Sequence, residues 1–172
     1  DVYKRQVFLS HLLDPERVAV GLAPADKWEL IDALVDRMPA GNGTTADVET
    51  IRAAVRAREE QLTTGLERGV ALPHALLSGD EVTPRAVLGI VPGGIDFESF
   101  DGEAARFVVL LVLPDDADGR SLHVSLLGQA IRLLTHEDLT ADLVAASESA
   151  AALDRLRAVS YTHLTLPTKW GG

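Results

Sequence analysis

The chain has 172 residues, a length that suits one domain and leaves little room for a second core. Apolar residues make up 47% of it and aromatics 5%, so we expect a packed core made mainly of Leu, Val, Ile and Ala. The formal net charge of −10, without any long run of Lys and Arg, argues against nucleic acid as a partner. The lack of cysteine excludes disulfides, thiolate catalysis and cysteine-based zinc sites, and fits a cytoplasmic protein.

The sequence also carries no sign of membrane insertion. No apolar run reaches the roughly 18 to 20 residues of a membrane-spanning helix, and no signal peptide is visible. Both ends resemble translated sequencing-adapter read-through: residues 1–6 read DVYKRQ, and the segment 160–172 contains SYTHLTLPTK. We therefore expect residues 7–159 to form the domain and the two end segments to be foreign. The natural ends would then be missing, and the domain could belong to a longer polypeptide.

The first third of the chain predicts a short helix, a strand and two longer helices. A short helix and then a strand over residues 17–22 are expected first. Asp26 and Glu29 have the spacing of a capping box, and apolar residues follow at helical spacing, so a helix begins at Asp26. After a glycine-containing loop, either Thr44 or Thr45 can cap a second helix.

The second helix carries an apolar stripe that one charged residue interrupts. Val48, Ile51, Val55 and Leu62 recur at helical spacing, and Arg58 occupies a position where an apolar residue is expected. A buried arginine needs an anionic partner, because removing its charge from water is costly. The alternative is a side chain that lies along the edge of the stripe with its charge in water.

The middle of the chain predicts strands separated by prolines, which cannot donate to a strand ladder. The last strand is a continuous apolar run, as expected of a central strand covered on both faces. Helices both precede and follow the strands, so we predict a single α/β domain with a mixed β-sheet flanked by helices on both faces. The expected strands are 70–72, 86–91 and 107–113, closed by Pro73, Pro92 and Pro114, and the expected later helices are 121–135, 139–146 and 149–159.

His74 is the first candidate for chemistry. It directly follows a strand-closing proline, and ligands of α/β sheets gather beyond the carboxyl ends of strands. Pro73 restricts the backbone on either side and gives the imidazole a stiff support. The preceding loop, residues 63–69, supplies two glycines and two threonine hydroxyls, which suits a small anion pocket. The alternative is a hydrogen-bonded surface histidine without a ligand.

His123 is the second candidate. With Ser121 as the N-cap, His123 would lie in the first turn of a helix, where free amides and the helix dipole favour an anion. If the first and third strands run parallel, Pro73 and Pro114 lie at the same edge of the sheet, and His74 and His123 could face one site. The alternative is a histidine that packs on a leucine of its own helix.

The remaining histidines offer no further site. We expect His136 to end a helix in a structural role. No HExxH or comparable spacing occurs, and neither a Walker loop nor a GxGxxG or GxSxG motif is present. The sequence therefore gives no reason to expect a metal or an organic cofactor.

The segment from Arg58 to Ala75, REEQLTTGLERGVALPHA, resembles the active-site signature of fructose/mannitol-type IIA domains of the bacterial sugar phosphotransferase system. That signature consists of an Arg-Glu pair, Ser/Thr-Thr-Gly, and Ala-[Ile/Val/Leu]-Pro-His. The similarity continues through residues 94–97 (GIDF), the pair Asp101-Gly102, an apolar strand ending in Leu-Pro, and a histidine near the start of a helix. It covers roughly residues 7–159.

The resemblance implies a phosphotransferase that carries phosphate on histidine. His74 would accept a phosphoryl group at Nε2 from the phosphocarrier protein HPr and pass it to a IIB domain, and through it to a membrane IIC permease. Arg58 and His123 would flank the phosphoryl group, and Thr64 is a further candidate hydroxyl donor. Nitrogen-type IIA relatives share the signature but signal by binding other proteins, so transport and regulation both remain open at this point.

Overall fold

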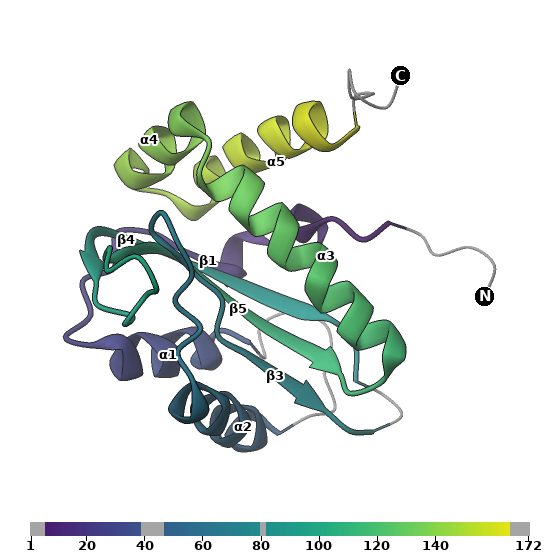
Figure 1. Ribbon diagram of the computed structural model, residues 1–172. Coiled ribbons are helices and arrows are strands. Elements are labelled where there is room, and N and C mark those ends of the chain that lie inside the picture. Colours follow the sequence, from purple (N-terminus) through teal and green to yellow (C-terminus); the bar gives the residue numbers. More distant parts are fainter. Residues whose placement is uncertain (1–5, 39–46, 80–81, 166–172) are drawn as a thin grey trace.

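The structure is a computed structural model that describes residues 6–38, 47–79 and 82–165. It confirms a single α/β domain in which helices cover both faces of a mixed five-stranded sheet (Figure 1). The elements in chain order are the 3-10 helices η1 (Leu9–Leu12) and η2 (Pro15–Arg17), β1 (Val18–Ala19), α1 (Lys27–Asp36), α2 (Val48–Gln61), β2 (Val70–Ala71), β3 (His74–Leu77), β4 (Arg85–Ile95), β5 (Ala105–Pro114), α3 (Ala117–Leu134), α4 (Glu137–Ala145) and α5 (Ser149–Thr165).

The sheet has the order β1-β4-β5, and both β2 and β3 pair in parallel with the outer side of β5. Only the β4–β5 pair is antiparallel within the described sheet. Strand β2 ends before Pro73, as predicted, but the pairing with β5 resumes directly after this proline as β3, in the same register. The Pro73 carbonyl still accepts a bond from the Leu111 amide, so the missing donor at this position does not stop the pairing.

Pro92, in contrast, does not close a strand. It lies inside β4, between Ile90 and Ile95, where the register against β5 is irregular. A proline is accommodated there because no regular ladder bond depends on its amide. Pro114 is the last residue of β5, as predicted.

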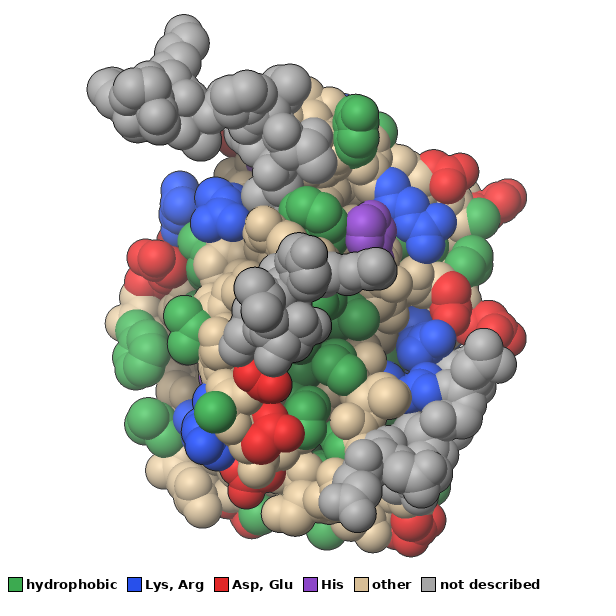
Figure 2. All heavy atoms as spheres, turned by 90° about the vertical axis from the view of Figure 1, so that its right-hand side faces the viewer, with side chains coloured by type: hydrophobic (Ala, Val, Ile, Leu, Met, Phe, Trp, Pro, Cys, Tyr) green, Lys and Arg blue, Asp and Glu red, His purple; other side chains and the backbone are tan. Residues whose placement is uncertain are grey.

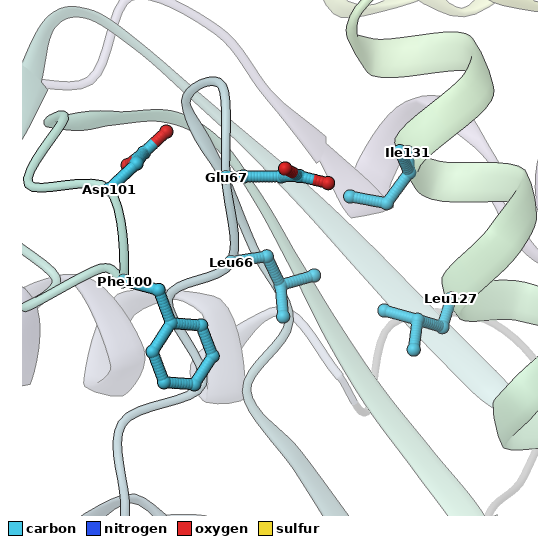
Figure 3. A pocket seen from close by; sticks show the side chains of 6 residues that line it. All are labelled: Leu66, Glu67, Phe100, Asp101, Leu127 and Ile131. Atoms are coloured by element: carbon cyan, nitrogen blue, oxygen red, sulfur yellow. The ribbon is translucent and has the colours of Figure 1, made fainter.

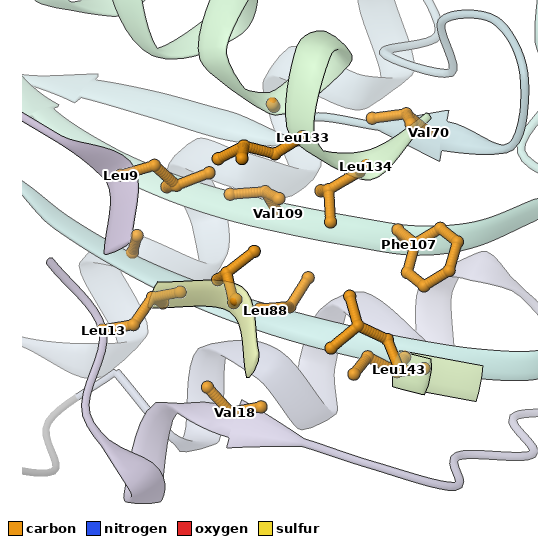
Figure 4. Packing of buried hydrophobic residues seen from close by; sticks show 14 of the residues in the cluster. Leu9, Leu13, Val18, Val70, Leu88, Phe107, Val109, Leu133, Leu134 and Leu143 are labelled. Atoms are coloured by element: carbon orange, nitrogen blue, oxygen red, sulfur yellow. The ribbon is translucent and has the colours of Figure 1, made fainter. Parts of the chain in front are cut away.

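The core lies in two layers, one on each face of the sheet. Along β5, Phe107, Val109 and Leu111 pack toward α3, α4 and α5 (Figure 4). The alternate residues Val108 and Leu110 pack toward α1 and α2. All five side chains are fully buried, which confirms the prediction that this apolar run is a central strand covered on both faces.

The helix ends agree with the sequence at Asp26 and differ from it at several other positions. Asp26 is the N-cap of α1 and accepts a bond from the Glu29 amide at 2.8 Å, as predicted. The N-cap of α2 is Asp47, and the predicted caps, Thr44 or Thr45, lie outside the described residues. Leu62 does not extend the apolar stripe of α2, because it follows the last helical residue and is 57% exposed.

The helix that carries His123 begins earlier than predicted. Asp116 is the N-cap of α3 and accepts a bond from the Gly119 amide at 2.7 Å, which places the start at Ala117 instead of Ser121. His136 directly follows Thr135, the C-cap of α3, and its amide donates to the Leu133 carbonyl at 3.2 Å, so the predicted place at a helix C-terminus is confirmed. It is also the N-cap of α4, where its ring accepts a bond from a backbone amide.

The last helix continues to Thr165, beyond the predicted boundary at residue 159. Ser160 is buried, and the hydroxyl of Ser10 donates to its hydroxyl at 3.1 Å. The foreign origin of the end segments remains a prediction. No helix within the described ranges has the length and apolar character needed to cross a membrane.

Figure 2 shows the face of the molecule at the end of the sheet toward which β3 and β5 run. Among its described side chains, acidic, basic and hydrophobic groups are interspersed, and the basic ones form small separate groups. This face therefore offers no continuous basic surface of the kind that nucleic acid requires.

Candidate functional site

The structure brings His74 and His123 together. Their ring centroids are 4.2 Å apart, and the ring planes are inclined by 41°. His74 is the first residue of β3 and only 8% exposed, whereas His123 on α3 is partly buried. A strand and the helix packed on it thus hold the two imidazoles in contact.

The reason for this meeting differs from the one predicted. Pro114 lies opposite Leu77 and not beside Pro73, so the two prolines do not mark one edge of the sheet. The histidines meet because α3 turns back over the sheet after β5. From Leu77 back to His74 is about 10 Å along the strand. The six residues from the start of α3 to His123 rise by about 9 Å and cover the same distance.

This arrangement places His123 in the second turn of α3. The free amides at the start of α3 belong to its first turn. They therefore lie too far from the His123 ring to bind the same anion, which the sequence had led us to expect them to do. His123 can act only through its imidazole.

A backbone contact fixes which nitrogen of His74 is free. Nδ1 lies 2.9 Å from the carbonyl oxygen of Leu72. A carbonyl can only accept a hydrogen bond, so Nδ1 carries the proton. In the neutral ring Nε2 then has an unshared electron pair, and no hydrogen bond to Nε2 occurs among the residues that the structure describes. The ring presents a nucleophilic nitrogen.

Both imidazoles are kept neutral. Burial lowers the pKa of His74, and the nearby Arg58 lowers it further, against the opposing effects of the Leu72 carbonyl and Glu59. Burial, followed by His74 and Arg58, lowers the pKa of His123 to about 4. Near neutral pH both imidazole rings are therefore uncharged, and each carries a single N–H proton.

Arg58 lies at the carboxyl end of α2, close enough to affect both histidines. Its side chain is partly buried, and Nη1 donates to the carbonyl oxygen of Leu62 at 3.0 Å. The described residues include no carboxylate paired with it, and its partial burial fits the second of the two alternatives, a side chain along the edge of the stripe. A cation at this end of the helix is favoured by the dipole, and its charge is left available to an anion at the histidines.

Thr64 is placed differently from the prediction. It is buried, and both its amide and its hydroxyl donate to the carboxylate of Glu59. The Glu59 side chain is completely buried and also pairs with Lys27 at 2.9 Å. The hydroxyl of Thr64 is thus engaged away from the imidazole. Our sequence reasoning gave no role to Glu59 or Lys27, although the spacing that singles out Arg58 fits Glu59 as well, four residues after Val55.

A loop packs closely on the segment that contains Thr64. The hydroxyl of Thr63 donates to the carbonyl of Phe97. A Cβ on Gly65 would lie 2.5 Å from the Ser99 hydroxyl and 2.7 Å from the Phe97 carbonyl. Only glycine allows this approach, which explains why the sequence has a glycine here.

A cavity lies beside the histidine pair and not around it. Its volume is about 460 Å³, and in Figure 3 Leu66 and Leu127 point toward each other across it, as do Glu67 and Ile131. Leu127 and Ile131 follow His123 by one and two turns along α3, so the cavity extends the same helix face. No group of three or more potential metal ligands occurs in the described part of the chain.

Comparison with known proteins assigns the family. A family model described as "Phosphoenolpyruvate-dependent sugar phosphotransferase system, EIIA 2" matches residues 11–159, which contain both histidines and Arg58. The chain belongs to this family. The resemblance inferred from the sequence is therefore confirmed.

Curated relatives of this EIIA chain have two kinds of name. The fructose-specific EIIA component of Haloferax volcanii is 29% identical over 88% of this chain and 96% of that protein. A nitrogen regulatory protein of Pseudomonas aeruginosa is also 29% identical, over 84% of this chain and 91% of that protein. The fructose-specific EIIABC component of Bacillus subtilis is 27% identical over 85% of this chain, which spans only 22% of that longer protein.

Solved structures share the fold of the EIIA chain. The nitrogen regulatory protein IIA-Ntr of Neisseria meningitidis matches with a TM-score of 0.70 at 19% identity, over 86% of this chain and 98% of that one. IIA mannitol of Escherichia coli matches with a TM-score of 0.69 at 22% identity, over 84% and 98%. A complex of the E. coli mannitol IIA enzyme with phosphorylated IIB also matches, with a TM-score of 0.67 at 20% identity, over 85% and 97%.

Proposed function

We propose that this chain is a phosphocarrier that accepts a phosphoryl group from phospho-HPr on Nε2 of His74 and passes it to a IIB domain for sugar uptake. The observation that carries the proposal is the bond from Nδ1 to the Leu72 carbonyl, which leaves Nε2 as the nucleophile. Membership of the EIIA family supports it. The IIB partner is suggested by the E. coli complex of a IIA enzyme with phosphorylated IIB.

The transfer needs little chemistry from the protein beyond positioning and charge compensation. The electron pair on Nε2 of His74 forms a new N–P bond while the N–P bond of the donor breaks. The electron pair of the broken bond returns to the imidazole of HPr. The Leu72 carbonyl stabilises the positive charge that develops on the ring, because it already accepts the Nδ1 proton. Onward transfer to IIB is the same step with His74 as the leaving group.

Two neighbours would support the phosphoryl group. Arg58 supplies a positive charge, and its guanidinium can bind phosphate oxygens with two parallel hydrogen bonds. His123 is neutral at rest, so its ring can either donate one hydrogen bond or take up a proton when the anion arrives. The pKa of His123 rises in the loaded state, because the negative phosphoryl group favours the charged ring.

A carrier between two proteins must present its site to both. Val124 is next to His123 and is 69% exposed, and Leu62, whose carbonyl binds Arg58, is also exposed. Phe100, on the rim of the adjacent cavity, is 74% exposed. Exposed apolar side chains around a polar centre are typical of surfaces that bind other proteins.

The test is a transfer assay with defined components. The chain is incubated with enzyme I, HPr and phosphoenolpyruvate, and the labelled residue is mapped. We expect label on His74 that is labile in acid and stable in alkali, and no label in the His74→Ala variant. Label on His123, or label that persists in His74→Ala, would refute the assignment.

A regulatory role is the second candidate, because nitrogen regulatory proteins are as similar to the chain as a fructose-specific component. In that role the phosphorylation state of His74 would control the binding of another protein. The two candidates differ in the second step. Rapid transfer from the loaded chain to a fructose-type IIB domain favours transport, whereas a loaded chain that retains its label beside every IIB domain tested favours regulation.

A further inference from the structure

We propose that Lys27 and Glu59 are positioning residues of the phosphoryl-transfer site, acting through Thr64 and Leu72 on the imidazole of His74. This inference rests on the function proposed above. Neither side chain lies at the reacting nitrogen, so both act through the groups they hold.

The connection is continuous from one side chain to the next. Lys27 Nζ pairs with Glu59 at 2.9 Å, and the carboxylate of Glu59 accepts from the Thr64 amide at 3.0 and 3.2 Å and from its hydroxyl. The Thr64 carbonyl accepts from the Leu72 amide at 3.0 Å. The Leu72 carbonyl accepts the Nδ1 proton of His74 at 2.9 Å. Each bond fixes the group that makes the next one.

Burial makes this connection rigid. The side chain of Glu59 is 0% exposed and that of Lys27 is 7% exposed, so neither charge can exchange its partner for water. The second partner of Lys27, Glu98 at 2.7 Å, is 69% exposed. Removing Lys27 would therefore leave Glu98 hydrated but would leave the buried carboxylate of Glu59 without a counter-charge.

The position of Lys27 is not explained by its own helix. It is the first residue of α1, where the helix dipole disfavours a cation. Desolvation alone would lower the pKa of Lys27, but the bonds to Glu98 and Glu59 outweigh this, and the pKa is raised. The lysine is held as a cation at the unfavourable end of a helix by two carboxylates from elsewhere in the chain.

The inference is testable because nearby groups affect the pKa of His74. They are Arg58 and Glu59 from α2 and the imidazole of His123 from α3. Glu59 raises the pKa of His74, and its carboxylate is paired with the ammonium of Lys27, a cation that would favour the neutral imidazole. Removing either member of the pair should therefore move the pKa of His74, and in opposite directions.

The experiment measures the tautomer and pKa of His74 by NMR of the imidazole nitrogens in the unphosphorylated chain, together with single-turnover transfer from phospho-HPr. Lys27→Met should raise the pKa of His74, and Glu59→Gln should lower it. Both should slow transfer about 10- to 100-fold, because the imidazole is less well held. Lys27→Arg should restore most of the rate, because it keeps the charge.

Arg56→Met is the matched control. Arg56 also links α2 to α1, through Asp32 at 3.1 Å and over the Trp28 ring at 5.0 Å, but it makes no contact with Thr64. A pair that only fastens the two helices would behave like this control, lowering stability while leaving the pKa of His74 and the rate unchanged. That result would overturn the proposal.

The outcomes separate this inference from the proposed function. If the unmodified chain takes no label from phospho-HPr, the proposed function fails, while the NMR measurement still decides whether Lys27 and Glu59 control His74. If the unmodified chain is labelled and both variants keep its rate and its His74 pKa, only the inference fails. If Lys27→Met does not fold, Glu59→Gln, which keeps the shape and an acceptor for Thr64, provides the same test.

Discussion

Replacing Arg58 with methionine separates charge compensation from folding. Methionine keeps much of the stem and removes the charge. The folded state loses the bond from Nη1 to the Leu62 carbonyl, worth about 0.5–1.5 kcal/mol, and a favourable interaction with the α2 dipole, worth about 0.3–1 kcal/mol. Part of this is offset because two buried imidazoles lose a nearby cation. We expect unfolding to become easier by less than about 2 kcal/mol.

Transfer should fall much further than stability. One charge-compensating group contributes about 3–5 kcal/mol to a transition state of this kind, which corresponds to a loss of roughly two to four powers of ten in rate. Lys at the same position should recover part of the loss, as a point charge without the planar fork. Arg58→Met should also raise the pKa of both His74 and His123, because the arginine lowers both.

The assay is single-turnover transfer from phosphorylated HPr, with urea unfolding of the same preparations as the measure of folding. A loss of rate at nearly unchanged stability supports the role given to Arg58. Near-normal transfer by Arg58→Met would refute it, and the residue would then serve only to bind the carbonyl of Leu62, the C-cap of its helix.

Three further results are expected. The free energy of unfolding should decrease as the pH falls from about 6.5 to 4. In this range the imidazole of His123 takes up a proton in the unfolded chain, whereas in the folded chain it stays neutral down to its pKa of about 4. His123→Gln should make the dependence of unfolding free energy on pH shallower, and equal slopes for the two proteins would contradict the argument. Gly65→Ala should destabilise the fold by about 1–3 kcal/mol in denaturant unfolding, because the added Cβ would meet the loop that packs on this segment. Gly93→Ala should cost less, because a Cβ there meets open space. Equal effects of the two substitutions would contradict this. Deleting residues 1–6 and 160–172 should cost less than about 2 kcal/mol, a cost that includes the bond between the hydroxyls of Ser10 and Ser160, and a loss of several kcal/mol in urea unfolding would show that they belong to the domain.

The sequence was most informative where one residue type has few structural uses. The continuous apolar run of β5 predicted a central strand, and the Asp26–Glu29 pair predicted the start of α1; both are confirmed. Prolines were less informative. Pro73 lies in a strand pairing that continues past it, because a proline interrupts a ladder only where its own amide would have been needed.

The site shows a different limit. Helical spacing singled out Arg58 but could not distinguish it from Glu59, because both positions lie close to the stripe of Val55. Which of the two side chains is buried depends on a lysine 32 residues earlier in the chain, and no local pattern predicts that pairing. The contact of the histidines was likewise anticipated for the wrong reason, since it depends on the length of α3 and on its direction over the sheet.

The charges around His74 suit a carrier better than a permanent phosphate site. At rest both imidazoles are neutral, and Arg58 is a cation that lowers the pKa of both. A phosphoryl group brings a charge of about −1.5 to −2 near neutral pH, so a single arginine compensates only part of it. Full compensation by several cations would stabilise the loaded state and slow its release. Partial compensation, with a second ring that can take up a proton when the anion arrives, allows the group to be accepted and then passed on.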